Sequence, residues 1–199
     1  MAFLRSPFAP ELPPALRGEY VTLRTPEMAD HQAWASLRLV SREFLTPWEP
    51  LWPSNDLTRS AFRIRIKRYW RDIEDDAAYP FFIFANETGA LLGAITLSNV
   101  RRGVAQMATL GYWIGQPYAR MGHMTAAMKL IKPFAFQHLH LHRIEAACLP
   151  VNTASVALLR RSGFRDEGLA CGYLKINGMW QDHLLFACLA PDGPGLAGP

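Results

Sequence analysis

The segment from Gly111 to Leu130, GYWIGQPYARMGHMTAAMKL, has the residue order of an anion-binding site. An apolar stretch leads into a short loop with Arg120 and Gly122, and apolar residues at helical spacing follow. The first four backbone N–H groups of a helix lack partners within the helix, and together with the helix dipole they attract phosphate. Glycine lets the backbone approach such a ligand closely, and arginine adds positive charge. An ordinary strand-to-helix turn is the alternative, since the loop matches neither a Walker loop nor G-x-G-x-x-G.

The elements that must position this loop follow from the periodicity of apolar residues. Alternating apolar and polar residues predict strands over 19–25, 79–86, 91–100, 106–115, 142–150, 165–175 and 182–190. Helical spacing and capping residues predict helices over 26–41, 55–78, 122–138 and 152–162, with a rigid apolar loop at 44–53. Strands first and strand–helix alternation afterwards predict one α+β domain, with α/β character in its second half, around a mixed sheet. This domain spans residues 1–199, with its core over roughly 20–190 and irregular ends at 1–18 and 191–199.

Composition and charge narrow the class of protein. Half of the 199 residues are hydrophobic and 12% are aromatic, which is typical of a globular domain with a sizeable core. The net charge of +4 is small, and the densest basic group, Arg63 to Arg71, alternates with apolar residues like the solvated face of a helix. We therefore expect no direct contact with nucleic acid. Prolines interrupt MAFLRSPFAPELPP where a signal peptide needs an apolar run, and no stretch reaches the roughly 18 apolar residues of a membrane span, so we expect a cytoplasmic protein without membrane contact.

The cysteines and histidines do not form a metal-binding pattern. Cys148, Cys171 and Cys188 lie in apolar contexts without metal-type spacing, and we expect free core thiols. The alternating histidines His138, His140 and His142 span a helix end and a strand start, so they cannot surround one ion. We expect a cationic helix C-terminus there and no metal cofactor.

A strand, the Gly122 loop, a helix, a strand and then NTASVALLRRSGF resemble the acyl-coenzyme-A-binding half of the GNAT acetyltransferase superfamily. In that family the loop reads roughly Gln/Arg-x-x-Gly-x-Gly/Ala, and its amides hold the pyrophosphate of acetyl-CoA. Here the central Gly122 is kept and Ala119 and Met124 depart from the pattern, while Arg120 supplies charge from the next position. The later helix resembles the family's Asn-x-x-Ser/Ala…Gly-Phe element, at Asn152, Ser155, Gly163 and Phe164.

Six separated motifs narrow the resemblance to the RimJ/RimL-like ribosomal-protein alanine N-acetyltransferases within this superfamily. They are FLTPWEP, NVRRG, LGYWIGQ, HLHRIEAACLPVN, LLRRSGF and YLKINGMWQDH. The resemblance implies the GNAT fold, a twisted and mostly antiparallel mixed sheet flanked by helices, with acetyl-CoA as the donor and the N-terminal amine of a ribosomal or other protein as the acceptor. It also implies coenzyme contacts from Leu110, Tyr112, Trp113, Ile114, Ala119, Arg120, Met121, Gly122, His123, Met124, Thr125, Asn152 and Ser155.

Acetyl transfer requires a neutral amine, a stabilised oxyanion and a proton for the leaving thiolate. Exposed N–H groups around Leu110–Ile114 would polarise the thioester carbonyl, and the same backbone would pair with the extended pantetheine arm. Thr109 stands where many GNAT enzymes carry a glutamate, and Leu159 stands where many carry a tyrosine on the later helix. Ser155 is the substitute proton donor that we predict, with a hydrogen bond inside its own helix turn as the alternative.

Further residues are predicted on the acceptor side. Glu49, beside Trp48 in the apolar loop, is the predicted general base because desolvation by tryptophans would favour proton uptake; a turn cap beside a core Trp48 is the alternative. In the hairpin GYLKINGMWQDH, Asp182 would accept a hydrogen bond from the incoming ammonium, and Tyr173 would line the acceptor slot as a catalytic candidate. The alternatives are a structural bond that pins the hairpin and a half-buried strand residue.

This limited acid–base equipment suits an N-terminal amine. An α-amine has a pKa near 7.7–8.0, so roughly a tenth is neutral at pH 7, whereas a lysine near 10.4 is neutral about once in two thousand molecules. A small-molecule amine acetyltransferase and a non-catalytic acyl-CoA sensor or ribosome-binding module are the competing functions. A monomer and a dimer are both compatible with the sequence.

Overall fold

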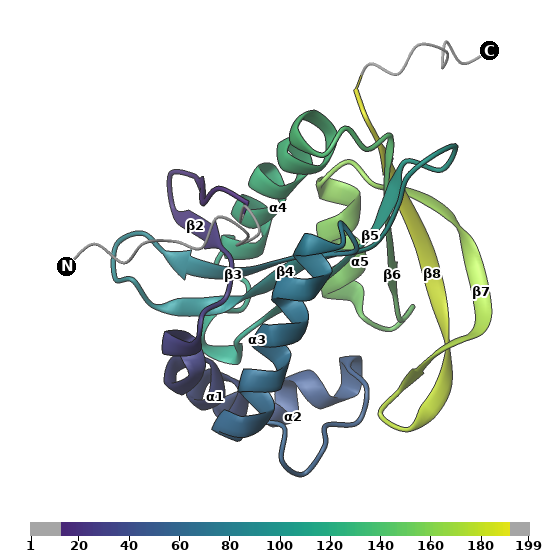
Figure 1. The fold of residues 1–199 in the computed structure, drawn as a ribbon. Coiled ribbons are helices and arrows are strands. Elements are labelled where there is room, and N and C mark those ends of the chain that lie inside the picture. The colour runs from purple at the N-terminus through teal and green to yellow at the C-terminus, as the bar shows by residue number, and fades with distance from the viewer. Residues whose placement is uncertain (1–12, 192–199) are drawn as a thin grey trace, which may run out of the picture.

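Residues 13–191, which the computed structural model describes, contribute eight strands to one sheet (Figure 1). The order is β1-β2-β3-β4-β5-β6-β8-β7, and every neighbouring pair is antiparallel except the parallel pair β5–β6. The bounds are β1 Leu16–Arg17, β2 Val21–Arg24, β3 Tyr79–Ala85, β4 Leu91–Arg101, β5 Met107–Ile114, β6 Arg143–Cys148, β7 Arg165–Ile176 and β8 Met179–Leu189. The expected mixed and mostly antiparallel sheet is confirmed.

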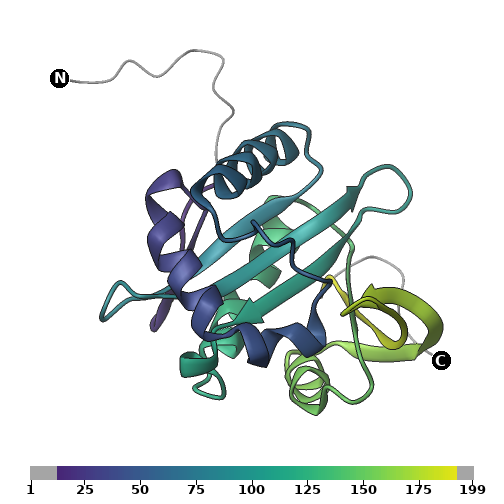
Figure 2. The ribbon, with the colours of Figure 1, turned by 90° about the horizontal axis from the view of Figure 1, so that it is seen from below.

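Helices cover both faces of this sheet (Figures 1 and 2). One face carries α1 (His31–Val40), continued by α2 (Arg42–Leu45), and α3 (Arg59–Glu74); the other carries α4 (His123–Pro133), the π-helical turn η4 (Phe134–His138) and α5 (Thr153–Arg161). Three short 3-10 turns complete the described helical elements: η1 Met28–Asp30, η2 Thr46–Trp48 and η3 Gln116–Tyr118. Each face has its own cluster of buried apolar side chains, so the sheet is a central layer between two cores.

The side chains of β5 alternate between these two cores, as the pleat of a strand requires. Leu110, Tyr112 and Ile114 belong to the cluster under α4 and α5, whereas Trp113 belongs to the cluster under α1 and α3. Gly111 is on the same face as Trp113, and a Cβ added to it would meet no atom within 4 Å. The sheet therefore has open space above Gly111 on the face that carries α1.

Strands β5 and β6 part after a short parallel pairing. Their register joins residues 107–109 of β5 to residues 143–145 of β6. Beyond that register, β5 stays paired with β4 as far as Ile114, and β6 stays paired with β8 as far as Cys148. A gap therefore opens between two strands that run in the same direction.

The parting of the two strands leaves part of the β5 backbone without a partner on this side. The amide of Gly115 donates to the carbonyl of Leu92 at 2.8 Å, on the side of β4. Backbone groups alternate sides along a strand, so the N–H and C=O groups of Tyr112 and Ile114 face away from β4 and into the gap. These groups lie beyond the last β5–β6 pair and have no strand partner among residues 13–191.

Each predicted helix and strand has a counterpart in the structure, but several predicted boundaries are wrong. Strand β1 lies in a segment predicted to be irregular, of which residues 1–12 are outside the described part, as are residues 192–199 at the other end. The helix predicted over 55–78 is shorter, because turns precede Arg59 and Asp76 has a positive φ of 52°. The last strand begins three residues early, at Met179.

The three cysteines are free, as predicted, but they are not all core residues. Cys148 and Cys188 are buried, whereas Cys171 is exposed. Cys171 lies on β7, one of the two edge strands of the described sheet, and all but two residues of β7 are exposed. The prediction of three core thiols is therefore wrong for Cys171, because an apolar sequence context does not reveal an uncovered edge strand.

The close approach of β4 to β5 depends on Gly93, and Gly93→Ala tests this dependence. A Cβ at Gly93 would lie 2.2 Å from the carbonyl oxygen of Trp113, so we expect the free energy of unfolding to fall by about 1–3 kcal/mol. Chemical denaturation should show this loss for Gly93→Ala and little change for Gly111→Ala, whose Cβ would enter open space. Equal stability of the two variants would show that the β4–β5 contact is not close-packed at Gly93.

Candidate functional site

The loop before α4 presents unpaired backbone amides to solvent. Gly122 caps α4 with a φ of 83°, and Arg120 also has a positive φ of 63°. Arg120, Met121 and Gly122 are exposed, and a Cβ at Gly122 would meet no atom within 4 Å. The left-handed backbone at Gly122 thus opens space in front of the first turn of α4, where the N–H groups point outward. Such a loop can hold an anionic group.

The other residues predicted to contact the coenzyme around this loop differ in how far their side chains are buried. Met124 is 8% exposed and belongs to the core, so only its amide can reach a ligand. His123 is half-buried and meets the ring of Tyr118 edge-on at 6.4 Å between centroids. Ala119 and Thr125 are half-buried at the rim of the loop and in the first turn of α4.

A basic hollow adjoins the loop, which sequence reasoning missed. It lies between α4 and the end of α5 and is lined by Thr125, Met128, Lys129, Lys132, Arg161, Ser162 and Gly163. Lys132 donates to the carbonyl of Ser162 at 2.8 Å, while Lys129 and Arg161 are exposed. The three cations come from two helices that only the fold brings together, so the sequence offers no signal beyond a lysine pair at helical spacing.

Across the gap between β5 and β6, two hydroxyl groups meet. Tyr112 on β5 and Ser155 on the first turn of α5 lie with their oxygens 2.6 Å apart. Burial raises the pKa of Tyr112 above its ordinary value, and the hydrogen bond with Ser155 offsets part of that rise. Tyr112 therefore stays protonated and can donate to Ser155, which leaves the hydrogen of Ser155 free for another acceptor in the gap.

The start of α5 is fixed by its cap. The side chain of Asn152 accepts a hydrogen bond from the amide of Ser155 at 3.1 Å. Cys148 ends β6 on the same side of the gap, and burial raises the pKa of its thiol. The predicted alternative for Ser155 is a hydroxyl bonded to backbone in the first turn of its helix, but the structure directs this hydroxyl to Tyr112, and only the Ser155 amide takes part in the cap.

The two positions without the usual acid–base groups differ in their surroundings. Leu159 is fully buried and belongs to the core. Thr109 is half-buried at the last β5–β6 pair, where its neighbour across the strands is Glu145. Glu145 accepts a hydrogen bond from the Nε of Arg143 at 2.9 Å, so the carboxylate of this strand neighbour is already ion-paired.

Glu49 is held by two side chains from the α1 face. Arg38 donates to both of its carboxylate oxygens, at 2.7 and 2.8 Å, and the indole of Trp52 donates to it at 2.7 Å. The Arg38 guanidinium lies 3.8 Å from the ring centroid of Trp52 and 5.0 Å from that of Trp113. Sequence reasoning missed Arg38, because a lone arginine in a helix pattern gives no signal of an inward side chain.

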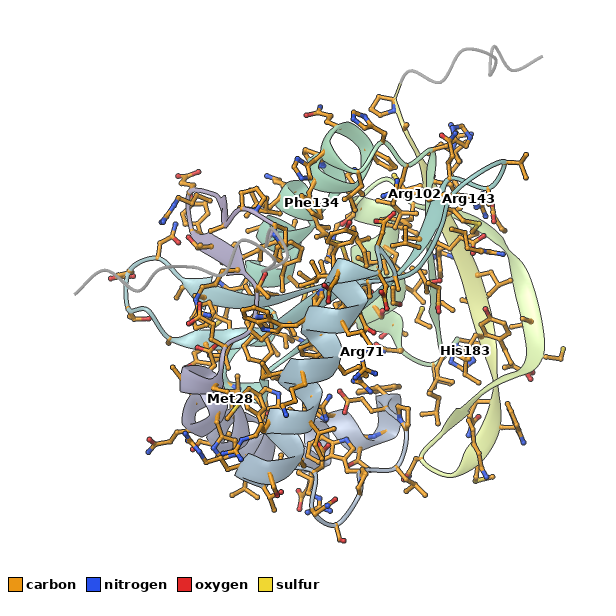
Figure 3. The ribbon with its side chains drawn as sticks, viewed as in Figure 1. Met28, Arg71, Arg102, Phe134, Arg143 and His183 are labelled. Carbon is orange, nitrogen blue, oxygen red and sulfur yellow. The ribbon has the colours of Figure 1, made fainter. Side chains whose placement is uncertain are left out.

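The β7–β8 hairpin approaches this loop. The carbonyl of Glu49 accepts a hydrogen bond from the amide of Asn177 at 2.9 Å. Asp182 accepts from the amide of Gly172 at 2.7 Å, which is the hairpin-pinning bond given as the alternative to an acceptor role. Tyr173 is 47% exposed and meets the buried ring of His183 edge-on at 5.8 Å. Figure 3 shows His183 on β8. Trp48 is half-buried at the end of η2.

The histidine-rich segment has a structural explanation. His138 stacks on Phe134, with 5.0 Å between ring centroids, at the end of η4. Residues 13–191 contain no group of three His, Cys, Asp or Glu side chains placed to hold a metal ion. Over the same residues, no helix combines the length and the apolar character needed to cross a bilayer.

Comparisons with known proteins agree on one family. Residues 21–165 match the acetyltransferase (GNAT) domain. The chain is 35% identical to the probable N-acetyltransferase YjcK of Bacillus subtilis, over 89% of this chain and 98% of that protein. It is also 35% identical to the [ribosomal protein uS5]-alanine N-acetyltransferase of Escherichia coli, over 82% of this chain and 85% of that enzyme.

A solved structure extends this agreement to three dimensions. RimJ of Mycobacterium smegmatis, in complex with CoA-disulfide, is 33% identical and superposes with a TM-score of 0.84, over 94% of this chain and 90% of that one. The predicted fold and enzyme class are therefore confirmed. The chain belongs to the GNAT acetyltransferase family, whose co-substrate is acetyl-CoA.

Proposed function

We propose that this enzyme transfers the acetyl group of acetyl-CoA to the N-terminal α-amine of a ribosomal or other protein. The observation that carries the proposal is the open space above Gly111, where an added Cβ would meet no atom within 4 Å, beside the β5 backbone that lacks a strand partner in the gap. The E. coli relative named for alanine of ribosomal protein uS5 supports this acceptor class. Ribosomal acceptors would place the reaction in the cytoplasm.

The coenzyme would lie along one continuous path. Its pyrophosphate would occupy the amides before α4, at Gly122 and the residues that follow it. Its nucleotide phosphate would lie near Lys129 and Arg161 in the basic hollow. The pantetheine arm would enter the gap and pair with the backbone of Tyr112 and Ile114, as an added strand would.

The chemical step would be direct attack on the thioester. The amine nitrogen bonds to the carbonyl carbon while N–H groups of β5 stabilise the oxyanion, and the carbon–sulfur bond then breaks. The neutral amine gives up one proton to solvent water, and the leaving thiolate gains one, so that no net proton is released. We assign the donation to the thiolate to Ser155, whose oxygen lies 2.6 Å from the Tyr112 hydroxyl and can accept a hydrogen bond from it. Glu49 as general base stays the alternative to a positioning role, and Trp48, Tyr173 and Asp182 stay predictions as acceptor-side residues.

The acceptor class can be measured with two peptides of one sequence that begins with alanine and contains an internal lysine. One peptide has a free N-terminus, and the other has a blocked one. We expect mass spectrometry to find acetylation of the free N-terminus only, because an α-amine is more often neutral near pH 7 than a lysine. Acetylation of the blocked peptide, turnover of small amines alone, or coenzyme binding without turnover would each contradict the proposal.

The phosphate site can be tested with the isosteric pair Gly122→Asp and Gly122→Asn. Asparagine tolerates the left-handed backbone at this position, whereas aspartate adds a negative charge in front of the α4 amides. Isothermal titration should show acetyl-CoA affinity falling at least about tenfold further for the aspartate variant, since like charges repel at short range. Equal affinities for the two variants would remove the pyrophosphate from this loop.

The proton donor can be tested with Ser155→Ala. We expect kcat to fall by about 10²-fold or more, with little change in acetyl-CoA affinity, because the thiolate would leave without a proton. Tyr112→Phe should lower kcat by a smaller factor, since Ser155 keeps its own hydrogen. Thr153→Ala, which removes an exposed hydroxyl from the same helix turn, is the matched control. An unchanged kcat for Ser155→Ala would exclude Ser155 as the donor.

A further inference from the structure

We propose that Arg38 is a positioning residue for the acceptor, and that the Glu49 carboxylate acts as its fixed partner. The pair would hold the loop over residues 46–53 at a set distance from β5. The proposal rests on the proposed function only in that it places the acceptor amine on the α1 face, above Gly111.

Two hydrogen bonds and two indole rings restrain the guanidinium of Arg38. Two N–H groups bind the two oxygens of Glu49, and the rings of Trp52 and Trp113 lie against the guanidinium. The side chain is 9% exposed, so this ion pair is shielded from screening by salt. Lysine cannot make two parallel bonds to a carboxylate or stack on an indole in this way.

Arg38 belongs to a helix that is attached to the end of β5. The hydroxyl of Ser41 accepts a hydrogen bond from the amide of Gln116 at 2.9 Å. Leu37 packs so closely that a Cβ at Gly115 would lie 2.3 Å from its Cδ1. Helix α1 therefore has a fixed position relative to the strand whose backbone lines the gap.

The same loop is attached on its other side to the β7–β8 turn. The Glu49 carbonyl accepts from the Asn177 amide at 2.9 Å, and a Cβ at Gly178 would lie 3.2 Å from the Cδ1 of Leu51. Glu49 thus joins α1 through its side chain and the hairpin through its backbone. Loss of the Arg38 contact would release the loop from β5 while leaving its contact with the hairpin.

This arrangement gives Glu49 a different role from the predicted general base. Both carboxylate oxygens accept charge-assisted hydrogen bonds, and one of them also accepts from Trp52. Protonation of Glu49 would therefore remove the charge assistance from both bonds to Arg38. A positioning pair predicts an activity loss that is independent of pH when either partner is changed, whereas a base predicts a loss that shrinks towards pH 9, where the α-amine is already neutral.

Arg38→Lys is the central test, with Arg24→Lys as a matched control. Arg24 also donates two hydrogen bonds to a carboxylate, Asp30, and lies 4.2 Å from the ring centroid of Phe84, but it is on β2 near the far edge of the sheet. We expect Arg38→Lys to lower kcat/KM for the peptide acceptor by roughly 10²-fold, the effect of a misplacement of about 1 Å, with acetyl-CoA affinity unchanged. Arg24→Lys should keep wild-type acceptor use.

Two further measurements test the positioning role whatever the acceptor is. Amide hydrogen exchange over residues 46–53 should become faster in Arg38→Lys and stay unchanged in Arg24→Lys, with or without any substrate. Glu49→Gln should lower kcat/KM by the same factor from pH 7 to pH 9. Unchanged exchange over the loop, wild-type acceptor use by Arg38→Lys, or a Glu49→Gln loss that disappears towards pH 9 would each overturn the proposal. If no peptide is acetylated but amide exchange over residues 46–53 is still faster in Arg38→Lys, the result would contradict the proposed function and leave the positioning role of Arg38 intact.

Discussion

The separation of β5 from β6 is the feature on which the whole site depends. These are the only parallel neighbours among the described strands, and they stay paired for three residues before each follows its other partner. Because both strands run in one direction and each leads into a helix, the N-termini of α4 and α5 come to the same edge of the sheet. One break in the sheet thus brings together a strand backbone without a partner, two helix starts and the Tyr112–Ser155 hydroxyl pair.

Because side chains alternate along β5, the two faces of the sheet have different roles. Tyr112 and Ile114 point towards α4 and α5, where the coenzyme path that we propose runs, and Trp113 points towards α1. Arg38 contacts both Trp113 and Glu49. It therefore fixes the position of the loop that would contact the acceptor relative to the strand that would hold the thioester. Acetyl transfer needs the two reacting groups at a fixed separation, and a rigid connection between the two faces supplies that requirement.

Periodicity and capping signals are local, and they predicted the order and type of the elements, including the Gly122 loop and the Asn152 cap. Family resemblance added the fold and the coenzyme. Contacts between segments that are distant in the sequence could not be predicted from these local signals. Arg38 and Glu49 are brought together by a loop whose path depends on α1, Tyr112 meets Ser155 across 43 positions of sequence, and the basic hollow joins two helices. The exposure of Cys171 was missed for the same reason, since burial on an edge strand depends on whether another element covers it.

The central claim, that the gap between β5 and β6 receives the pantetheine arm, can be tested most directly by amide hydrogen exchange measured residue by residue with NMR. Addition of CoA should slow exchange at Tyr112 and Ile114, whose amides face the gap, because the coenzyme would give them hydrogen-bond partners. Gly111 and Trp113, whose amides face β4, are already paired and should change little. Unchanged exchange at Tyr112 and Ile114, or uniform slowing along the whole strand, would contradict the account.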